Sequence, residues 1–120
     1  MGNITEEKIK NLSQLEIKIL IQEHFQKILF KEVKEDQLNT DESLNLFILK
    51  IKDLIYKDLK NYIEFNSNIN SEFLDLIKLF IYYVGEENKN NFQEIDLAFH
   101  SILIESLNKF KGELYSHLTN

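Results

Sequence analysis

Apolar residues recur along most of the chain with the three- to four-residue spacing of an amphipathic helix. Ser13 stands three residues before Glu16, which is the spacing of a capping box. The apolar positions that follow on one helical face are Ile17, Leu20, Ile21, Phe25 and Ile28. This pattern predicts a helix over residues 14–33, with a shorter helix over residues 4–12 ahead of it.

Two further stripes of apolar residues predict long helices later in the chain. Thr40 or Asp41 can cap a helix over residues 41–65. Its apolar face is formed by Leu44, Phe47, Ile48, Ile51, Ile55, Leu59, Tyr62 and Ile63. Asn91 begins a capping-type spacing, and the pattern after it predicts a last helix over residues 91–118.

The segment over residues 71–84 is the most apolar part of the chain and is predicted to be a short helix. Ser71 or Asn70 can cap its start, and Gly85 stands where a helix end favours a left-handed residue. A helix with so narrow a polar stripe either lies centrally in a bundle or exposes apolar surface to a partner.

Residues 79–84 also match the composition of a β-strand. We prefer a helix there, because a lone strand in an otherwise helical chain would have no pairing partner. The predicted fold is therefore all-α, a four-helix bundle or a related orthogonal helical array, with the short extra helix at its N-terminal end. Residues 1–120 are expected to form a single helical domain.

Composition excludes several classes of function. The 120 residues include 20 acidic and 14 basic side chains, for a net charge of −6, and every basic residue is lysine. Without cysteine the chain has no disulfide, no thiol catalysis and no cysteine-based metal site. An acidic protein is poorly suited to binding nucleic acid directly. Because we find neither a secretory signal nor a membrane-spanning stretch, we expect a cytoplasmic protein.

Candidate catalytic or metal-binding residues are few. His24 lies on the apolar stripe of its helix, and we interpret it as a packed histidine rather than a ligand or general base. Asp96 and His100 are four residues apart, as are Glu113 and His117, so each pair is half a metal site or a solvated ion pair. No catalytic or cofactor motif accompanies them. We therefore expect no enzyme, cofactor or bound metal, and a metal-dependent enzyme remains a weaker alternative.

The net charge is concentrated in one part of the sequence. Residues 61–108 contain eight acidic residues and two lysines, whereas residues 1–60 contain eleven acidic residues and ten lysines. Two tyrosines stand at the end of the apolar segment in the same region, and acidic residues follow them. Tyrosine is enriched at binding hot spots, and clustered carboxylates steer basic partners. The predicted partner-binding residues are Tyr82, Tyr83, Glu86, Glu87, Glu72, Asp75 and Glu94.

Residues 79–87 read Leu-Phe-Ile-Tyr-Tyr-Val-Gly-Glu-Glu. This stretch resembles the short helix with two tyrosines, followed by acidic residues, of the immunity proteins that neutralise nuclease bacteriocins. Those proteins are small, acidic and built from four helices, and their tyrosines and nearby acids bind the toxin. The resemblance implies that role for Tyr82, Tyr83, Glu86 and Glu87. The chain lacks the proline that usually follows the tyrosines.

These observations favour a small acidic protein-binding inhibitor that acts by occlusion. We expect an immunity protein, an antitoxin or an anti-defence protein whose partner is a basic nucleic-acid-handling protein, such as a nuclease toxin. The alternative is a structural or regulatory subunit that forms a homodimer through the apolar helix over residues 73–84. A soluble helix end whose tyrosines only cover the core would also explain the same residues.

Overall fold

Residues 5–65 and 71–119 are described by a computed structural model, and helices dominate both ranges. The elements are α1 (Glu6–Lys10), α2 (Gln14–Glu32), α3 (Asp41–Phe65), α4 (Leu74–Val84), the 3-10 helix η1 (Glu86–Asn88) and α5 (Phe92–Thr119). Within the described ranges there is no strand, and residues 79–84 belong to α4. The predicted all-α helical bundle is therefore confirmed.

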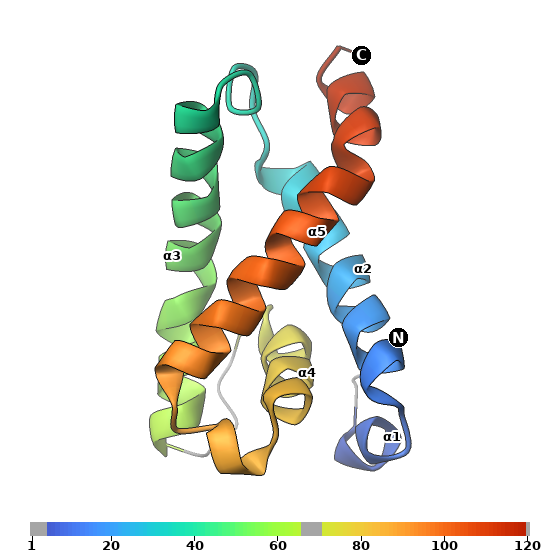
Figure 1. Ribbon diagram of the computed structural model, residues 1–120, viewed down its shortest axis with the longest axis vertical. Coiled ribbons are helices and arrows are strands. Elements are labelled where there is room, and N and C mark those ends of the chain that lie inside the picture. Colours follow the sequence, from blue (N-terminus) through green and yellow to red (C-terminus); the bar gives the residue numbers. More distant parts are fainter. Residues whose placement is uncertain (1–4, 66–70, 120) are drawn as a thin grey trace.

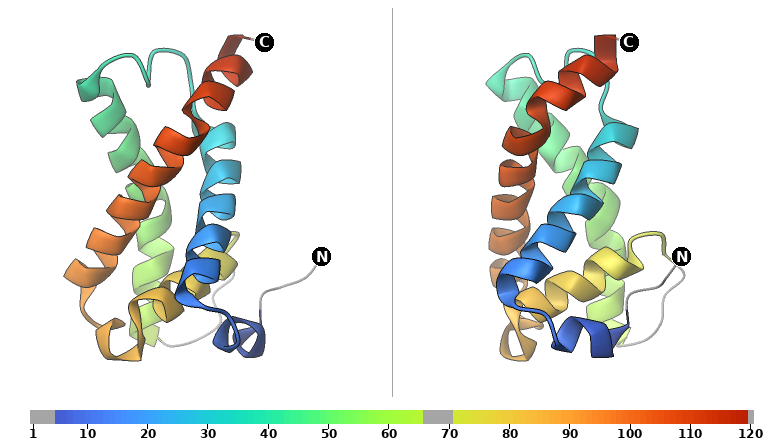
Figure 2. Two further views of the ribbon diagram at one scale, coloured as in Figure 1. Left: turned by 45° about the vertical axis from the view of Figure 1, so that its right-hand side comes forward. Right: turned by 90° about the vertical axis from the view of Figure 1, so that its right-hand side faces the viewer.

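Helices α2 and α5 both run from the α4 end of the bundle towards the opposite end and cross each other at an angle, α3 runs the opposite way, and the short α4 crosses one end of the bundle (Figures 1 and 2). Several side-chain pairs join α2 to α5 along their length. They are Lys18 with Glu105, Gln26 with Glu113, and Phe30 with His117. The contact between the two helices thus extends over about three turns of α2.

An aromatic cluster joins the four main helices at the centre of the core. The ring of Phe99 on α5 lies 5.0 Å from Phe25 of α2, 4.8 Å from Tyr56 of α3 and 5.1 Å from Phe80 of α4, measured between centroids. Two of these contacts are edge-to-face and one is stacked, which are favourable arrangements for aromatic pairs. Phe99 is fully buried and so connects every main helix to the same core.

Helix α4 occupies a central position because most of its apolar side chains face the other helices. The buried ones are Leu76, Ile77, Leu79, Phe80 and Ile81. A homodimer through this helix would need apolar surface that these side chains already bury within the chain. Among the helices of the described ranges, none is both long and apolar enough to cross a membrane.

The predicted helix starts are largely confirmed by hydrogen bonds. Ser13 and Glu16 form a complete capping box at the start of α2. Thr40 caps α3, since its hydroxyl oxygen accepts the backbone N–H of Ser43 at 3.0 Å. Asn91 caps α5 by accepting the backbone N–H of Glu94 through its side-chain oxygen.

The predicted start of the short apolar helix is wrong by three residues. α4 begins at Leu74, and Phe73 is its N-cap residue without a side-chain cap. The hydroxyl of Ser71 accepts the backbone N–H of Phe73 and donates to Asp58 of α3, so it organises a turn before the helix instead of capping it. The alternative cap, Asn70, lies outside the described residues.

Candidate binding site

The predicted partner-binding residues do not form one continuous patch. In chain order they are Glu72, Asp75, Tyr82, Tyr83, Glu86, Glu87 and Glu94. The first two lie at the start of α4, the tyrosines in its last turn, and the others in η1 and the first turn of α5. α4 is eleven residues long, which corresponds to about 16 Å, so its two ends are separate surfaces.

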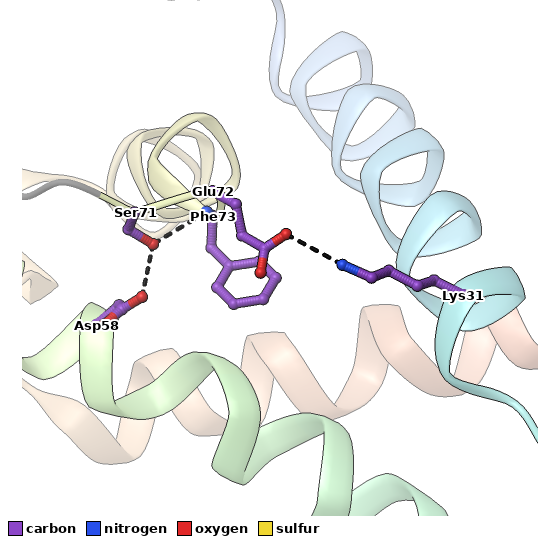
Figure 3. A network of polar contacts seen from close by, with 5 residues as sticks. All are labelled: Lys31, Asp58, Ser71, Glu72 and Phe73. Atoms are coloured by element: carbon purple, nitrogen blue, oxygen red, sulfur yellow. Dashed lines mark hydrogen bonds and ion pairs between the residues drawn. The ribbon is translucent and has the colours of Figure 1, made fainter.

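At the start of α4, Glu72 contacts α2 (Figure 3). Its Oε2 atom lies 3.4 Å from Nζ of Lys31, and both side chains are about two-thirds exposed. Beside this pair, the Ser71 hydroxyl donates a hydrogen bond of 2.6 Å to Asp58. Because an exposed ion pair contributes only about 0–1 kcal/mol, Glu72 is held loosely by Lys31.

The half-buried His24 lines a cavity of about 200 Å³ at this same end of α4. Phe73, Leu76 and Leu54 supply apolar walls. Burial lowers the pKa of His24, and the charge of Lys27 lowers it further, while Asp75 and Glu23 act in the opposite direction. The apolar environment therefore favours the neutral imidazole.

The two adjacent tyrosines point to different neighbours. The carbonyl oxygen of Tyr83 accepts a hydrogen bond of 2.9 Å from the Gln14 side chain, and Tyr83 contributes to the electrostatic environment of Lys18 on α2. Tyr82 instead interacts with Glu6 of α1 and Tyr62 of α3. Consecutive helix residues are about 100° apart, so the pair cannot serve one flat surface.

Tyr82 and Glu86 line a cavity of about 510 Å³ that four elements enclose. We call this space the α1–α4 cavity. Its other lining residues are Glu6 and Lys10 of α1, Tyr62 and Ile63 of α3, Lys78 and Ile81 of α4, and Lys89 and Asn90 beyond η1. Its volume lies in the usual range of ligand-binding pockets.

The two phenols of the α1–α4 cavity share its lining with two glutamates and three lysines. Burial raises the pKa of Tyr82, and the charges of Glu6 and Glu86 raise it further. Burial and the same two glutamates raise the pKa of Tyr62, while Lys89 acts in the opposite direction. Both phenols therefore stay protonated at neutral pH and can donate hydrogen bonds.

The turn that carries Glu86 and Glu87 depends on Gly85. This residue has φ of 93° and ψ of 152°, a combination that side-chain-bearing residues rarely adopt. A Cβ atom at Gly85 would also lie 2.7 Å from a carboxylate oxygen of Glu87. The amide side chain of Asn88 donates to the carbonyl of Val84 at 2.9 Å, which further fixes the turn.

Lysines from the first half of the chain partly neutralise the acidic region. Within the described residues, three ion pairs join the two halves: Lys31 with Glu72, Lys52 with Asp96, and Lys18 with Glu105. The charge asymmetry along the sequence is therefore smaller in space than the residue counts indicate. Glu86 also contacts a lysine, Lys89, at 3.1 Å.

Residues of the two pairs considered as half metal sites are engaged in other contacts. Asp96 accepts a hydrogen bond from Tyr56 and pairs with Lys52, Glu113 accepts one from Gln26, and the His117 ring packs on Phe30 at 5.2 Å. Across residues 5–65 and 71–119, no group of three or more histidine and acidic side chains is placed to hold a metal ion.

Sequence reasoning missed the residues that α1 and α3 contribute to the α1–α4 cavity. Glu6, Lys10 and Tyr62 are distant in sequence from Tyr82, and no local pattern connects them. Tyr62 was included only as a member of an apolar stripe. The arrangement of α1 against α4 brings these side chains together.

Comparison with known proteins found no matching family model, no matching curated protein and no matching solved structure.

Proposed function

We propose that this chain is a small cytoplasmic protein-binding inhibitor that acts without catalysis, in the manner of an immunity protein, an antitoxin or an anti-defence protein. Its partner is a basic nucleic-acid-handling protein, such as a nuclease toxin. The end of the bundle formed by α1, the last turn of α4 and η1 is the binding surface. The observation that carries the proposal is that Tyr82 and Glu86 line one cavity with Tyr62 and Glu6.

The chemistry of these four side chains suits a basic surface. Each phenol offers a large ring and a hydroxyl, which is the combination enriched at binding hot spots. The carboxylates of Glu6 and Glu86 can accept charge-assisted hydrogen bonds from arginine or lysine. Both glutamates are exposed, so a partner can reach them without unfolding the helix end.

Further acidic residues close to the cavity would accelerate the encounter. Glu87 in η1 and Glu94 in the first turn of α5 are both exposed. Exposed carboxylates of this kind raise the association rate of a positively charged partner, and salt weakens the effect. In this proposal they steer the partner, while Tyr82 and Glu86 hold it.

The mechanism would be steric occlusion. The bundle would cover the basic surface with which the partner handles nucleic acid, and the complex would persist without turnover. An inhibitor of this kind needs one stable surface and no reactive group.

Affinity capture from cells of the source organism, followed by identification of the bound protein, tests the proposal. The association rate of the purified partner should fall steeply between low and high salt. The variant Tyr82→Ala with Glu86→Lys should weaken binding at least about thirtyfold, because one hot-spot residue contributes about 2 kcal/mol or more. Glu35→Lys, an exposed charge reversal in the α2–α3 loop, is the matched control.

Unchanged affinity of the Tyr82 and Glu86 variant, with the control also unchanged, would show that the proposed surface is wrong. A partner that is acidic, or an association rate independent of salt, would contradict the proposed mechanism.

A further inference from the structure

We propose that the α1–α4 cavity binds a small organic phosphate monoester. Lys10 and Lys78 hold the phosphoryl group, and the organic part lies against the ring of Tyr62 and the side chain of Ile81. Such a site goes beyond the inhibitor role proposed above and would exist without it.

The helices bring cationic and apolar side chains to the cavity together. Lys78, Ile81 and Tyr82 are three to four residues apart on one face of α4, so their side chains line the same space. Helix α1 contacts α4, and its buried Ile9 anchors it to the core. Lys10 follows Ile9 directly and brings a second ammonium group to the cavity.

Both carboxylates of the cavity are already engaged within the chain. Glu86 forms an ion pair of 3.1 Å with Lys89. Glu6 interacts with the phenol of Tyr82. Neither glutamate therefore neutralises the two remaining lysines of the lining.

Those two lysines, Lys10 and Lys78, are unpaired. Among the described residues, neither side chain forms an ion pair or a hydrogen bond. Lys78 is moreover half-buried on the most apolar helix, where an ammonium group loses hydration without gaining a counter-ion. The charge that is left unbalanced in the cavity is therefore positive, and it favours an anion.

Two ammonium groups match the charge of a phosphate monoester, which carries about −1.5 to −2 at neutral pH. Lysine binds phosphate through its charge and its three N–H donors. The hydroxyl of Tyr62 stays protonated at neutral pH and can donate a further hydrogen bond to a phosphoryl oxygen. Cation and neutral donors are thus present in one cavity.

The size and walls of the cavity indicate an organic ester instead of phosphate alone. Its volume of about 510 Å³ is far larger than a phosphate ion and lies in the range of pockets for small organic ligands. Ile63 and Ile81 add apolar surface beside the rings of Tyr62 and Tyr82. The organic part of the ligand would bury this surface.

A bound phosphate monoester is compatible with a basic protein partner. It would neutralise Lys10 and Lys78, which otherwise repel such a partner. Glu87 and Glu94 are exposed and do not line the cavity, so they remain available to steer the partner.

Three small molecules serve as probes: phenyl phosphate, inorganic phosphate and 2-phenylethylammonium. Each would be titrated into the full chain while the ring resonances of Tyr62 and Tyr82 are followed by NMR. We expect phenyl phosphate to shift both rings in a saturable manner and to bind at least about threefold more tightly than inorganic phosphate, because its ring buries apolar surface. The cation should give no saturable shift.

Saturable binding of 2-phenylethylammonium, or no shift with phenyl phosphate, would overturn the proposal. Equal affinities for phenyl phosphate and inorganic phosphate would show that the apolar walls take no part, and would overturn the assignment of an organic ester.

Lysine variants test which side chains hold the phosphoryl group. Lys10→Gln combined with Lys78→Gln should weaken phenyl phosphate about tenfold, and the exposed Lys10→Gln alone about threefold. Lys34→Gln, in the α2–α3 loop, is the matched control and should leave the affinity unchanged. Unchanged affinity of Lys10→Gln would overturn the assignment even where the double variant does not fold, which the backbone amide spectrum shows.

Glu86→Gln distinguishes an anion site from a cation site by the sign of its effect. The change releases Lys89 from its ion pair, so phenyl phosphate should bind about threefold more tightly. Weaker binding after this change would contradict the proposal.

Discussion

The hydroxyl of Tyr56 on α3 donates a hydrogen bond of 2.5 Å to Oδ1 of Asp96 on α5. Nζ of Lys52, one turn earlier on α3, lies 3.2 Å from the same oxygen. The Tyr56 ring also packs against Phe92 and Phe99 of α5. These contacts connect α3 to the first half of α5, where the two helices approach each other (Figure 1).

We expect Tyr56→Phe to lower the free energy of unfolding by about 1–2 kcal/mol, because it removes a hydrogen bond to a charged acceptor and keeps the ring. Asp96→Asn should have a similar effect, and the double variant should cost less than the sum. Urea unfolding of the three variants measures this coupling. Strictly additive losses would show that Tyr56 and Asp96 do not stabilise the fold as a pair.

Alkaline titration should separate the five tyrosines of the chain into groups. Burial raises the pKa of Tyr56 far above its usual value, and the hydrogen bond to Asp96 raises it further. Burial and nearby glutamates also raise the pKa of Tyr62 and the pKa of Tyr82. These phenols favour the folded state while they are neutral, so their contribution to stability is complete below pH 10 and declines as the pH rises further. Tyrosinate absorbance should therefore rise late, and Tyr56→Phe should remove the last step. An unaltered late step would contradict this assignment.

The stability of the fold should decrease between neutral and mildly acidic pH because of His24. Burial and Lys27 lower the pKa of this residue, so the unfolded chain binds a proton near pH 6.5 while the folded chain resists it. We expect His24→Gln to reduce the loss of unfolding free energy between pH 7 and pH 5. His100→Gln, at an exposed position on α5, is the control. An NMR titration that places the His24 pKa above 6.5 would contradict the prediction.

The two described glycines should respond oppositely to alanine. Gly112 lies inside α5, and a Cβ atom there would meet no atom within 4 Å, so Gly112→Ala should stabilise the protein by about 0.5–1 kcal/mol. Gly85→Ala should destabilise it by about 1–3 kcal/mol, because alanine disfavours φ of 93°; the exposed Glu87 carboxylate, 2.7 Å from the added Cβ atom, can move aside. Thermal unfolding of both variants provides the measurement. Equal shifts of Tm in one direction would refute this interpretation.

Periodicity and capping signals were sufficient to predict most of the fold. The long helices have apolar stripes and polar caps, so the bounds of α3 were predicted without error and those of α2 and α5 within one residue. The start of α4 was mispredicted because the hydroxyl of Ser71 bonds to Asp58 of α3. A local pattern does not show that a partner on another helix will compete for a capping group.

The candidate site was only partly predictable for the same physical reason. Tyr82 and Glu86 stood out because an apolar segment ends beside acidic residues. Glu6 and Tyr62 carry no comparable local signal, and only the packing of α1 and α3 against α4 brings them to the cavity. The separation of Tyr82 from Tyr83 follows from helix geometry itself, whereas the different neighbours that they meet depend on how α1, α2 and α3 pack against α4.

The long sequence separation between α2 and α5 has a consequence for synthesis of the chain. Lys18 and Gln26 of α2 meet Glu105 and Glu113 of α5 only after 87 further residues have been made. Until then Phe25 and the other apolar side chains of α2 lack the helix that covers them in the finished fold. Because α5 is the last of the described helices to be made, the core can close only after α5 has left the ribosome, and a nascent chain stalled before α5 would expose apolar surface suited to chaperone binding.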